Sequence, residues 1–143
     1  IVYQMKNTIM ICCSLFFFGM ATSSLKAQTQ LEKNKYVVLS KNIQQLPAIL
    51  QTATALENED GELFGEFQVI FCGKTLQNIP QNQEFIALLK TAKKQGVKIF
   101  ACGISLTKFN LSKKDVPSGL PITENGILHA FQLQKQGFLT LSI

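Results

Sequence analysis

The sequence predicts an α/β protein built on a parallel sheet with helices on both faces. Short apolar runs, typical of strands buried on both sides, alternate with segments whose apolar residues recur at helical spacing. The chain has 143 residues, of which 46% are apolar, so it is long enough for one globular domain and too short for two. Because parallel neighbours need crossover connections, this alternation favours one sheet within one domain.

The first strand and the first helix are predicted directly after a polar leader. Residues 36–40 form a continuous apolar run that ends at Ser40. Asn42 can cap a helix, with Pro47 in its first turn, whose apolar positions are Ile43, Leu46, Ile49, Leu50, Ala53 and Leu56. The acidic run at 57–62 predicts an exposed turn that ends this helix and has no catalytic role.

Two further strands, at 67–72 and 97–102, each end in a cysteine followed by a glycine. Between them Asn82 caps a helix that Gly96 ends, with the apolar stripe Phe85, Leu88, Leu89 and Ala92. Ligands and reactive groups of α/β proteins collect at the carboxyl ends of parallel strands. We therefore expect Cys72 and Cys102 at that edge of the sheet.

The remaining segments are shorter. We expect a short helix at 105–110, a turn-rich stretch at 113–121, a very short strand at Ile122, and a last helix that begins at Thr123 or Asn125 and ends at Gly137. Residues 138–143 alternate apolar and polar side chains, which predicts a sheet edge or a subunit contact. A homo-oligomer is expected, because self-association would cover apolar surface.

The first 27 residues predict a secretory signal peptide. Lys6 supplies the positive charge, residues 8–21 form the apolar region, and residues 25–27 precede Gln28 as a cleavage site. The apolar run is shorter than the ~20 residues that a spanning helix needs, so no stable membrane anchor is expected after cleavage. The prediction is an exported, periplasmic protein with a flexible leader at 28–35 and a domain at 36–143.

Composition argues against two classes of partner. All 14 basic residues are lysines, and arginine is the residue that forks onto phosphates and base edges, so nucleic-acid binding is disfavoured. Cys12 and Cys13 fall in the signal peptide, which leaves Cys72 and Cys102 for one disulfide, a metal pair or free thiols. Because these two are far apart in sequence and His129 is the only histidine, we expect no metal site, and no cofactor is predicted.

Four blocks of the C-terminal half resemble the DsrE/DsrF-like family. These are residues 96–106 (GVKIFACGISL), 115–117 (DVP), 125–127 (NGI) and 133–138 (LQKQGF), and the resemblance extends over 36–143. It implies a three-layer α/β/α sandwich with a mostly parallel five-stranded sheet, an oligomer and, for the best-understood members, relay of sulfur as a cysteine persulfide. Cys102 occupies the position of the family's cysteine, and the Ala-Cys-Gly-x-Ser pattern resembles an exported branch.

One position departs from such relatives. Their second strand often ends in His-Gly, whereas this chain has Cys72 and Gly73 there. The departure removes a possible base and adds a second thiol. Whether the chain is an enzyme is left open by the resemblance, because a fold does not decide a function.

The residues themselves give a physical reason for chemistry at Cys102. A thiol at a strand end, followed by Gly103 and a helix start near Ser105, would face unpaired backbone N–H groups that lower its pKa from the free value of ~8.5. A persulfide carrier needs that thiolate, and a sulfur donor or acceptor protein would be its partner. Cys102 is thus the candidate catalytic residue, and Gly103, Ser105, Cys72 and Gly73 are the candidate binding residues around it.

Three alternatives stay open. Cys102 can be a buried structural cysteine, and the domain can be a non-catalytic module that binds a small ligand or a partner. A buried sulfur with no pocket would favour that module. A Cys72–Cys102 disulfide is the third alternative, although a glycine after each cysteine suggests loops that diverge from the sheet. His129 either faces solvent or leans toward the sheet as an acid or base.

Overall fold

The computed structural model describes residues 32–143, and the predicted signal peptide and residues 28–31 of the predicted leader lie outside them. The strands are β1 (Asn34–Ser40), β2 (Phe64–Phe71), β3 (Lys98–Cys102), β4 (Ile122–Thr123) and β5 (Phe138–Ser142). The α-helices are α2 (Leu46–Asp60), α3 (Gln83–Lys94), α4 (Gly103–Lys108) and α5 (Gly126–Lys135). Short 3₁₀ turns are η1 (Ile43–Gln45), η2 (Gly61–Leu63), η3 (Lys74–Asn78) and η4 (Lys113–Asp115).

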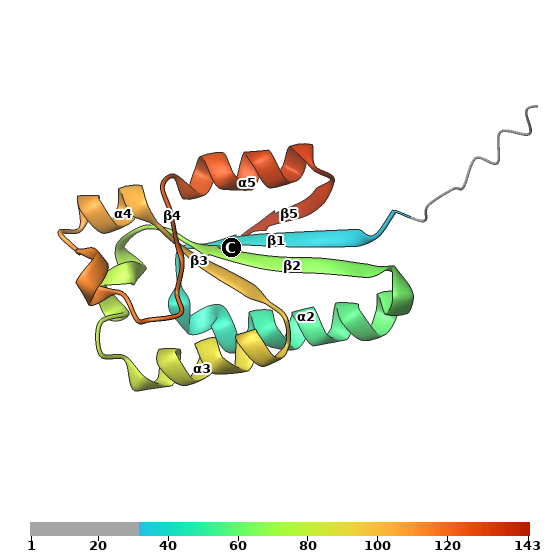
Figure 1. Ribbon diagram of the computed structural model, residues 1–143, viewed down its shortest axis with the longest axis horizontal. Coiled ribbons are helices and arrows are strands. Elements are labelled where there is room, and N and C mark those ends of the chain that lie inside the picture. The colour runs from blue at the N-terminus through green and yellow to red at the C-terminus, as the bar shows by residue number, and fades with distance from the viewer. Residues whose placement is uncertain (1–31) are drawn as a thin grey trace, which may run out of the picture. The chain divides into compact units, whose positions relative to one another are not determined.

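All five strands are parallel, in the order β4-β3-β2-β1-β5. The chain steps from β1 to β4 in one direction and then returns across the sheet to β5. Because crossovers between parallel strands are right-handed, this reversal places α5 on the face opposite α2 and α3. Figure 1 shows α2 and α3 on one side of the strands and α5 on the other. The predicted three-layer fold and the edge position of residues 138–143 are confirmed.

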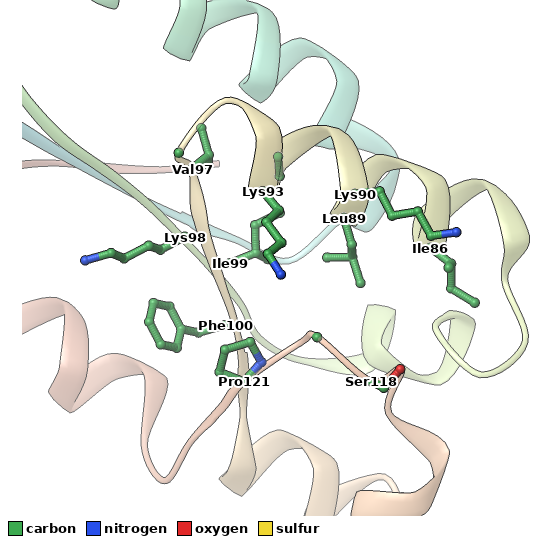
Figure 2. Close-up of a pocket in the computed structure, with 13 residues that line it drawn as sticks. Ile86, Leu89, Lys90, Lys93, Val97, Lys98, Ile99, Phe100, Ser118 and Pro121 are labelled. Carbon is green, nitrogen blue, oxygen red and sulfur yellow. The ribbon is translucent and has the colours of Figure 1, made fainter.

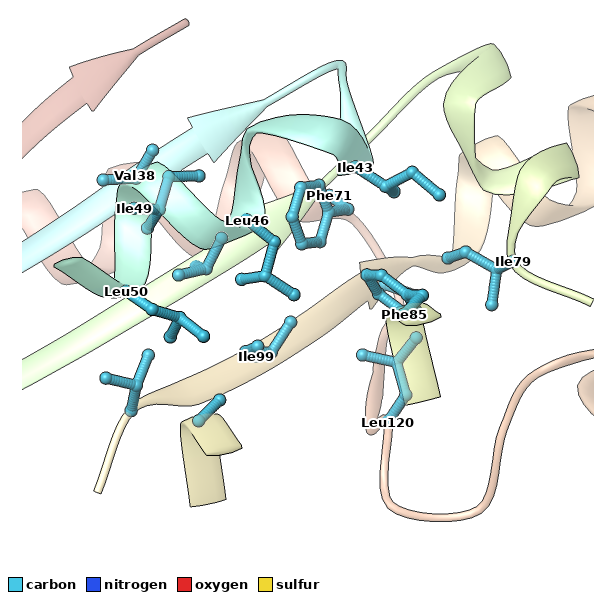
Figure 3. Close-up of a cluster of buried hydrophobic side chains, with 14 of the residues drawn as sticks. Val38, Ile43, Leu46, Ile49, Leu50, Phe71, Ile79, Phe85, Ile99 and Leu120 are labelled. Atoms are coloured by element: carbon cyan, nitrogen blue, oxygen red, sulfur yellow. The ribbon is translucent and has the colours of Figure 1, made fainter. Parts of the chain in front are cut away.

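The larger core lies between the sheet and the helices α2 and α3. Figure 3 shows its side chains from α2, α3 and the strands meeting over one face of the sheet, among them Leu46, Phe71, Phe85 and Ile99. Phe71 and Phe85 meet edge to face with ring centroids 5.8 Å apart. A smaller cluster lies under α5 and contains Val37, Ile70, Cys72, Cys102, Ala130, Leu133 and Phe138. Both candidate cysteines therefore belong to the α5 side of the sheet.

Two predicted boundaries were wrong. β1 begins at Asn34, inside the predicted leader, because its polar first residues pair with β2 and β5: Asn34 lies opposite Phe64, and Lys35 opposite Phe138. The acidic run is not a turn either, because α2 continues through Asp60 before Gly61 ends it at φ 55°. Asp60 accepts hydrogen bonds from Tyr36 Oη (2.7 Å) and Asn34 Nδ2 (2.9 Å), which join the end of α2 to the start of β1.

Within residues 32–143, none of the helices has the length and apolar character that crossing a membrane requires.

Candidate functional site

The two cysteines lie next to each other at the carboxyl edge of the sheet. Cys102 is the last residue of β3, and Cys72 directly follows β2. Phe71 is the register partner of Ala101, so the next pair of positions is Cys72 and Cys102, which share the α5 face of the sheet. The predicted placement of both cysteines is confirmed.

The sulfur of Cys102 lies at the start of α5. Asn125 caps this helix, and its Oδ1 accepts the N–H groups of Ile127 and Leu128, both at 3.1 Å. The N–H of Gly126 donates instead to Cys102 Sγ at 3.3 Å. The positive end of a helix dipole therefore faces the sulfur, which favours the thiolate.

Only glycine fits at position 126, because a side chain would be too close to neighbouring atoms. A Cβ built on it would lie 2.7 Å from Cys72 Sγ, 2.9 Å from Ile70 Cγ2 and 3.0 Å from Cys102 Cβ. Any side chain there would overlap both cysteines. The sequence indicated only a cap or turn at Asn125 and Gly126, and a glycine directly after an N-cap was the one available sign of this close approach.

Ser105 connects the two loops that follow the cysteines. It is buried in α4, and its Oγ accepts the N–H of Gly73 at 2.8 Å. Its hydroxyl and its own N–H also lower the pKa of the Cys102 thiol. Ser105 therefore links the loop after Cys72 to the surroundings of Cys102.

Gly103 allows close packing at the start of α4. It begins α4, and a Cβ on it would lie 3.0 Å from the carbonyl oxygen of Glu124. The next residue, Ile104, donates its N–H to that same oxygen at 3.1 Å. Gly103 therefore lets the start of α4 pack against the segment between β4 and α5, which in turn positions the start of α5.

The environment moves the pKa values of the two thiols in opposite directions. Burial raises the pKa of Cys102, but hydrogen bonds from the Ser105 hydroxyl, the Gly126 N–H, the Ser105 N–H and the Cys72 thiol outweigh it, and the net pKa is lowered. Burial, the charge of Cys102 and a hydrogen bond to Cys102 raise the pKa of Cys72 to about 12. Of the two thiols, Cys102 is therefore the one that ionises first as the pH rises.

The prediction that the two loops carry the thiols apart was wrong. Both cysteines are free, and their side chains lie on the same side of the sheet next to Gly126, whose missing Cβ would lie 2.7 Å from Cys72 Sγ and 3.0 Å from Cys102 Cβ. The glycines bend the chain only after the cysteines: Gly73 has a φ of 82°, and Gly103 begins α4. The direction of the cysteine side chains is therefore set by the strands and not by the glycines.

Access to the pair is limited. Cys102 is 3% exposed and Cys72 is 7% exposed. A cavity of about 740 Å³ lies elsewhere, between α3, β3 and the 118–121 segment, and its lining includes neither cysteine. Figure 2 shows its residues, with Leu89 and Ile86 from α3 facing Pro121 and Ser118. This burial is the observation that favours the binding-module alternative.

His129 leans on the sheet but away from the cysteines. Its Nε2 lies 3.0 Å from Gln68 Oε1, and its ring centroid lies 5.0 Å from that of Phe100. Gln68 precedes Cys72 by four residues on the same strand face, which is about 13 Å at the rise of a β-strand. The imidazole of His129 is therefore paired with Gln68 and Phe100 and not with either sulfur.

The part of the chain from 32 to 143 contains no group of three or more His, Cys, Asp or Glu side chains that could hold a metal ion.

Comparisons with known proteins place the chain in a family. No curated protein matches it. Two similar solved structures are the protein of unknown function MTH1491 from Methanobacterium thermoautotrophicum and the conserved protein of unknown function BT1422 from Bacteroides thetaiotaomicron. MTH1491 is 17% identical to this chain, with a TM-score of 0.59, and the match covers 77% of this chain and 100% of MTH1491. BT1422 is 16% identical, with a TM-score of 0.58, and the match covers 76% of this chain and 95% of BT1422. The model of the DsrE/DsrF-like family matches residues 48–141, so the chain belongs to that family.

Proposed function

We propose that this protein carries sulfane sulfur as a persulfide on Cys102. The observation that carries the proposal is the set of donors around one sulfur: the Gly126 N–H at 3.3 Å at the start of α5, and the hydroxyl and N–H of Ser105. These donors lower the pKa of a thiol that burial alone would raise. A thiolate is the form that attacks sulfane sulfur.

The loading step balances without a further reactant. The Cys102 thiolate attacks the outer sulfur of a persulfide donor, RSSH. The S–S bond of the donor breaks, RS⁻ leaves, and Cys102 becomes Cys–S–SH. When an acceptor thiolate later attacks the outer sulfur, the S–S bond breaks and the Cys102 thiolate leaves, so the same N–H donors stabilise the leaving group.

The burial of Cys102 sets a condition on this reaction. At 3% exposure the sulfur is reached only when the start of α5 opens locally. Ile127 and Leu128, in the first turn of α5, are more than half exposed, so this turn has few contacts to lose. Loading is therefore slower than the reaction of a free thiol with the same thiolate fraction.

The test uses the full chain with Cys12→Ser and Cys13→Ser, so that Cys72 and Cys102 are the remaining thiols. The protein is exposed to a low-molecular-weight alkyl persulfide and cleaved with trypsin, which separates Cys102 (peptide 99–108) from Cys72 (peptide 42–74). Peptide 99–108 is expected to gain the mass of one sulfur in a Cys72→Ser background, and Cys102→Ser abolishes the gain. No gain on 99–108 would overturn the proposal.

A second candidate function is a module that binds a small ligand, favoured by the burial of Cys102 and by the cavity beside β3. Leu89, Ile86 and Pro121 supply apolar lining there, and Lys90 and Lys93 supply charge. A thermal-shift screen of small acids would detect such a ligand, and Leu89→Lys should remove the shift. A ligand whose shift Leu89→Lys removes, together with no sulfur on Cys102, would make the module the function.

Export and periplasmic location are part of the proposal, because an oxidising compartment allows oxidised forms of a cysteine to persist. The support is the signal-peptide pattern of residues 1–27. Expression of the full chain in a bacterium, followed by N-terminal sequencing of the periplasmic fraction, should give a chain that begins at Gln28. A chain retained in the cytoplasm at full length would contradict export.

A further inference from the structure

We propose that Cys72 is a resolving thiol, so that the site reduces sulfane sulfur to sulfide and closes as a Cys72–Cys102 disulfide. The inference rests on the proposed persulfide at Cys102. A persulfide carrier passes its sulfur on unchanged. The resolving role of Cys72 adds a second reaction step, whose product is sulfide.

The backbone places the two residues at a distance that a disulfide accepts. Phe71 and Ala101 are register partners on adjacent parallel strands, and Cys72 and Cys102 follow them directly. Adjacent strands lie about 4.8 Å apart. The Cα atoms joined by a disulfide are usually about 4.4–6.8 Å apart, so closure needs little movement of either strand.

The side chains already point at each other. Cys72 and Cys102 belong to the same buried cluster under α5, and both side chains approach Gly126. Gly126 lies over the pair, and the Cβ that it lacks would lie 2.7 Å from Cys72 Sγ and 3.0 Å from Cys102 Cβ. The absence of a side chain at Gly126 thus lets the start of α5 lie directly against both cysteines.

The second step balances as the first does. Cys72 gives up its proton, and its sulfur attacks the inner sulfur of Cys102–S–SH. The S–S bond of the persulfide breaks, a disulfide forms between Cys72 and Cys102, and the outer sulfur leaves with the proton as hydrogen sulfide. The two thiols together lose two electrons, and the sulfane sulfur gains them.

The two cysteines have different environments that fit these two roles. Cys102 has the helix start and Ser105 as donors, which favour the thiolate that reacts first. Cys72 is held protonated next to it, and the charge of Cys102 is one cause. The rate of persulfide loading on Cys102 should therefore stop rising at a lower pH than the rate of sulfide release. Sulfide release should continue to accelerate above that pH, because Cys72 must lose its proton before it can attack.

The experiment compares three proteins in the Cys12→Ser, Cys13→Ser background: the parent, Cys72→Ser and Cys102→Ser. Each receives a limiting amount of alkyl persulfide, and sulfide is measured colorimetrically. Non-reduced tryptic digests are searched for peptide 42–74 linked to peptide 99–108. Non-reducing gels establish that the link is within one chain, and thermal melts establish that each variant is folded.

The parent is expected to release about one sulfide per disulfide formed and to keep no persulfide. Cys72→Ser should keep the added sulfur on 99–108 and release none above the Cys102→Ser background. If the parent keeps its persulfide as Cys72→Ser does, the resolving role is overturned and the carrier role stands. If Cys72→Ser gains no sulfur, the proposed function fails first, and the resolving role fails with it.

A separate measurement tests the geometry alone. Treatment of the folded parent with a thiol oxidant such as diamide should link 42–74 to 99–108, and an added dithiol should reverse the link. If Cys72→Ser melts too low to use, Cys72→Ala replaces it in the same comparison. Failure of the oxidant to link the peptides in the folded parent would overturn the inference without involving sulfur loading.

Discussion

The N–H of Gly126 donates a hydrogen bond to Cys102 Sγ at 3.3 Å, across 24 positions of sequence. The bond joins the first residue of α5 to the last residue of β3, with β4 between them in the chain. A sulfur is a weak acceptor when protonated and a stronger one as a thiolate. The start of α5 therefore gains stability when Cys102 ionises, and this couples the packing of α5 to the charge of the thiol.

Ser105→Ala should raise the pKa of Cys102, because it removes a hydroxyl donor that stabilises the thiolate. Since the thiolate is the reactive form, alkylation of peptide 99–108 at pH 7 should slow by about tenfold or more, the effect of losing one hydrogen bond to a charged group. The midpoint of the alkylation rate against pH should move upward. The matched control is Thr107→Ala, an exposed hydroxyl on the same helix, which should leave the midpoint unchanged.

Gly126→Ala should destabilise the fold by about 1–3 kcal/mol, because the new Cβ overlaps Cys72 Sγ, Ile70 Cγ2 and Cys102 Cβ. Adding Cys72→Ala removes the closest of these atoms and should recover part of the loss. The measurement is a double-mutant cycle from urea unfolding, with Cys72→Ala alone as the reference. Additive costs would mean that α5 moves away from the sheet to accept the methyl group.

Tyr36→Phe should cost about 1 kcal/mol at pH 7, because it removes the hydrogen bond from Tyr36 to Asp60. The bond to Asp60, burial and the charge of Asp60 raise the pKa of Tyr36 to about 12. A folded pKa above the unfolded value of ~10 means that this stability is present below pH 10 and is lost as the pH rises towards 12.

The difference between Tyr36→Phe and the parent should therefore shrink between pH 10 and pH 12 in urea unfolding. Glu57→Gln, an exposed change near the same end of α2, is the matched control and should alter stability by less than about 0.5 kcal/mol. A Tyr36→Phe cost that stays constant up to pH 12 would contradict the role given to Asp60.

Self-association stays a prediction, and β5 is the surface that we expect to take part. Leu139 and Leu141 are 63% and 58% exposed on the face of this edge strand that α2 leaves open. Light scattering should give a mass above that of one chain, and Leu139→Lys with Leu141→Lys should lower it, because the lysines cannot be buried without cost. Thr140→Lys, exposed on the opposite face of β5, should not. A monomeric mass for the parent at high concentration would contradict the prediction.

Much of the fold could be predicted from local pattern. The apolar runs gave β2 and β3 within three residues, and Asn42, Asn82 and Asn125 cap η1, α3 and α5 through their side chains. These features depend on a residue and its near neighbours in the chain. The placement of Cys72 and Cys102 at one edge also followed, because all parallel strands end on the same side of the sheet. Asp60 was missed because its partners, Asn34 and Tyr36, are distant in sequence.

The relation between the cysteines was decided only by tertiary structure. Which strands are neighbours, and in which register, depends on the packing of whole layers, so the pairing of β2 with β3 that brings Cys72 beside Cys102 has no local sign. The contact of Gly126 with both cysteines requires α5 to return across the sheet. The sequence alone determined that two thiols would lie at the carboxyl edge of the sheet. Their burial and the opposite shifts of their pKa values follow from the packing of α4 and α5 around them.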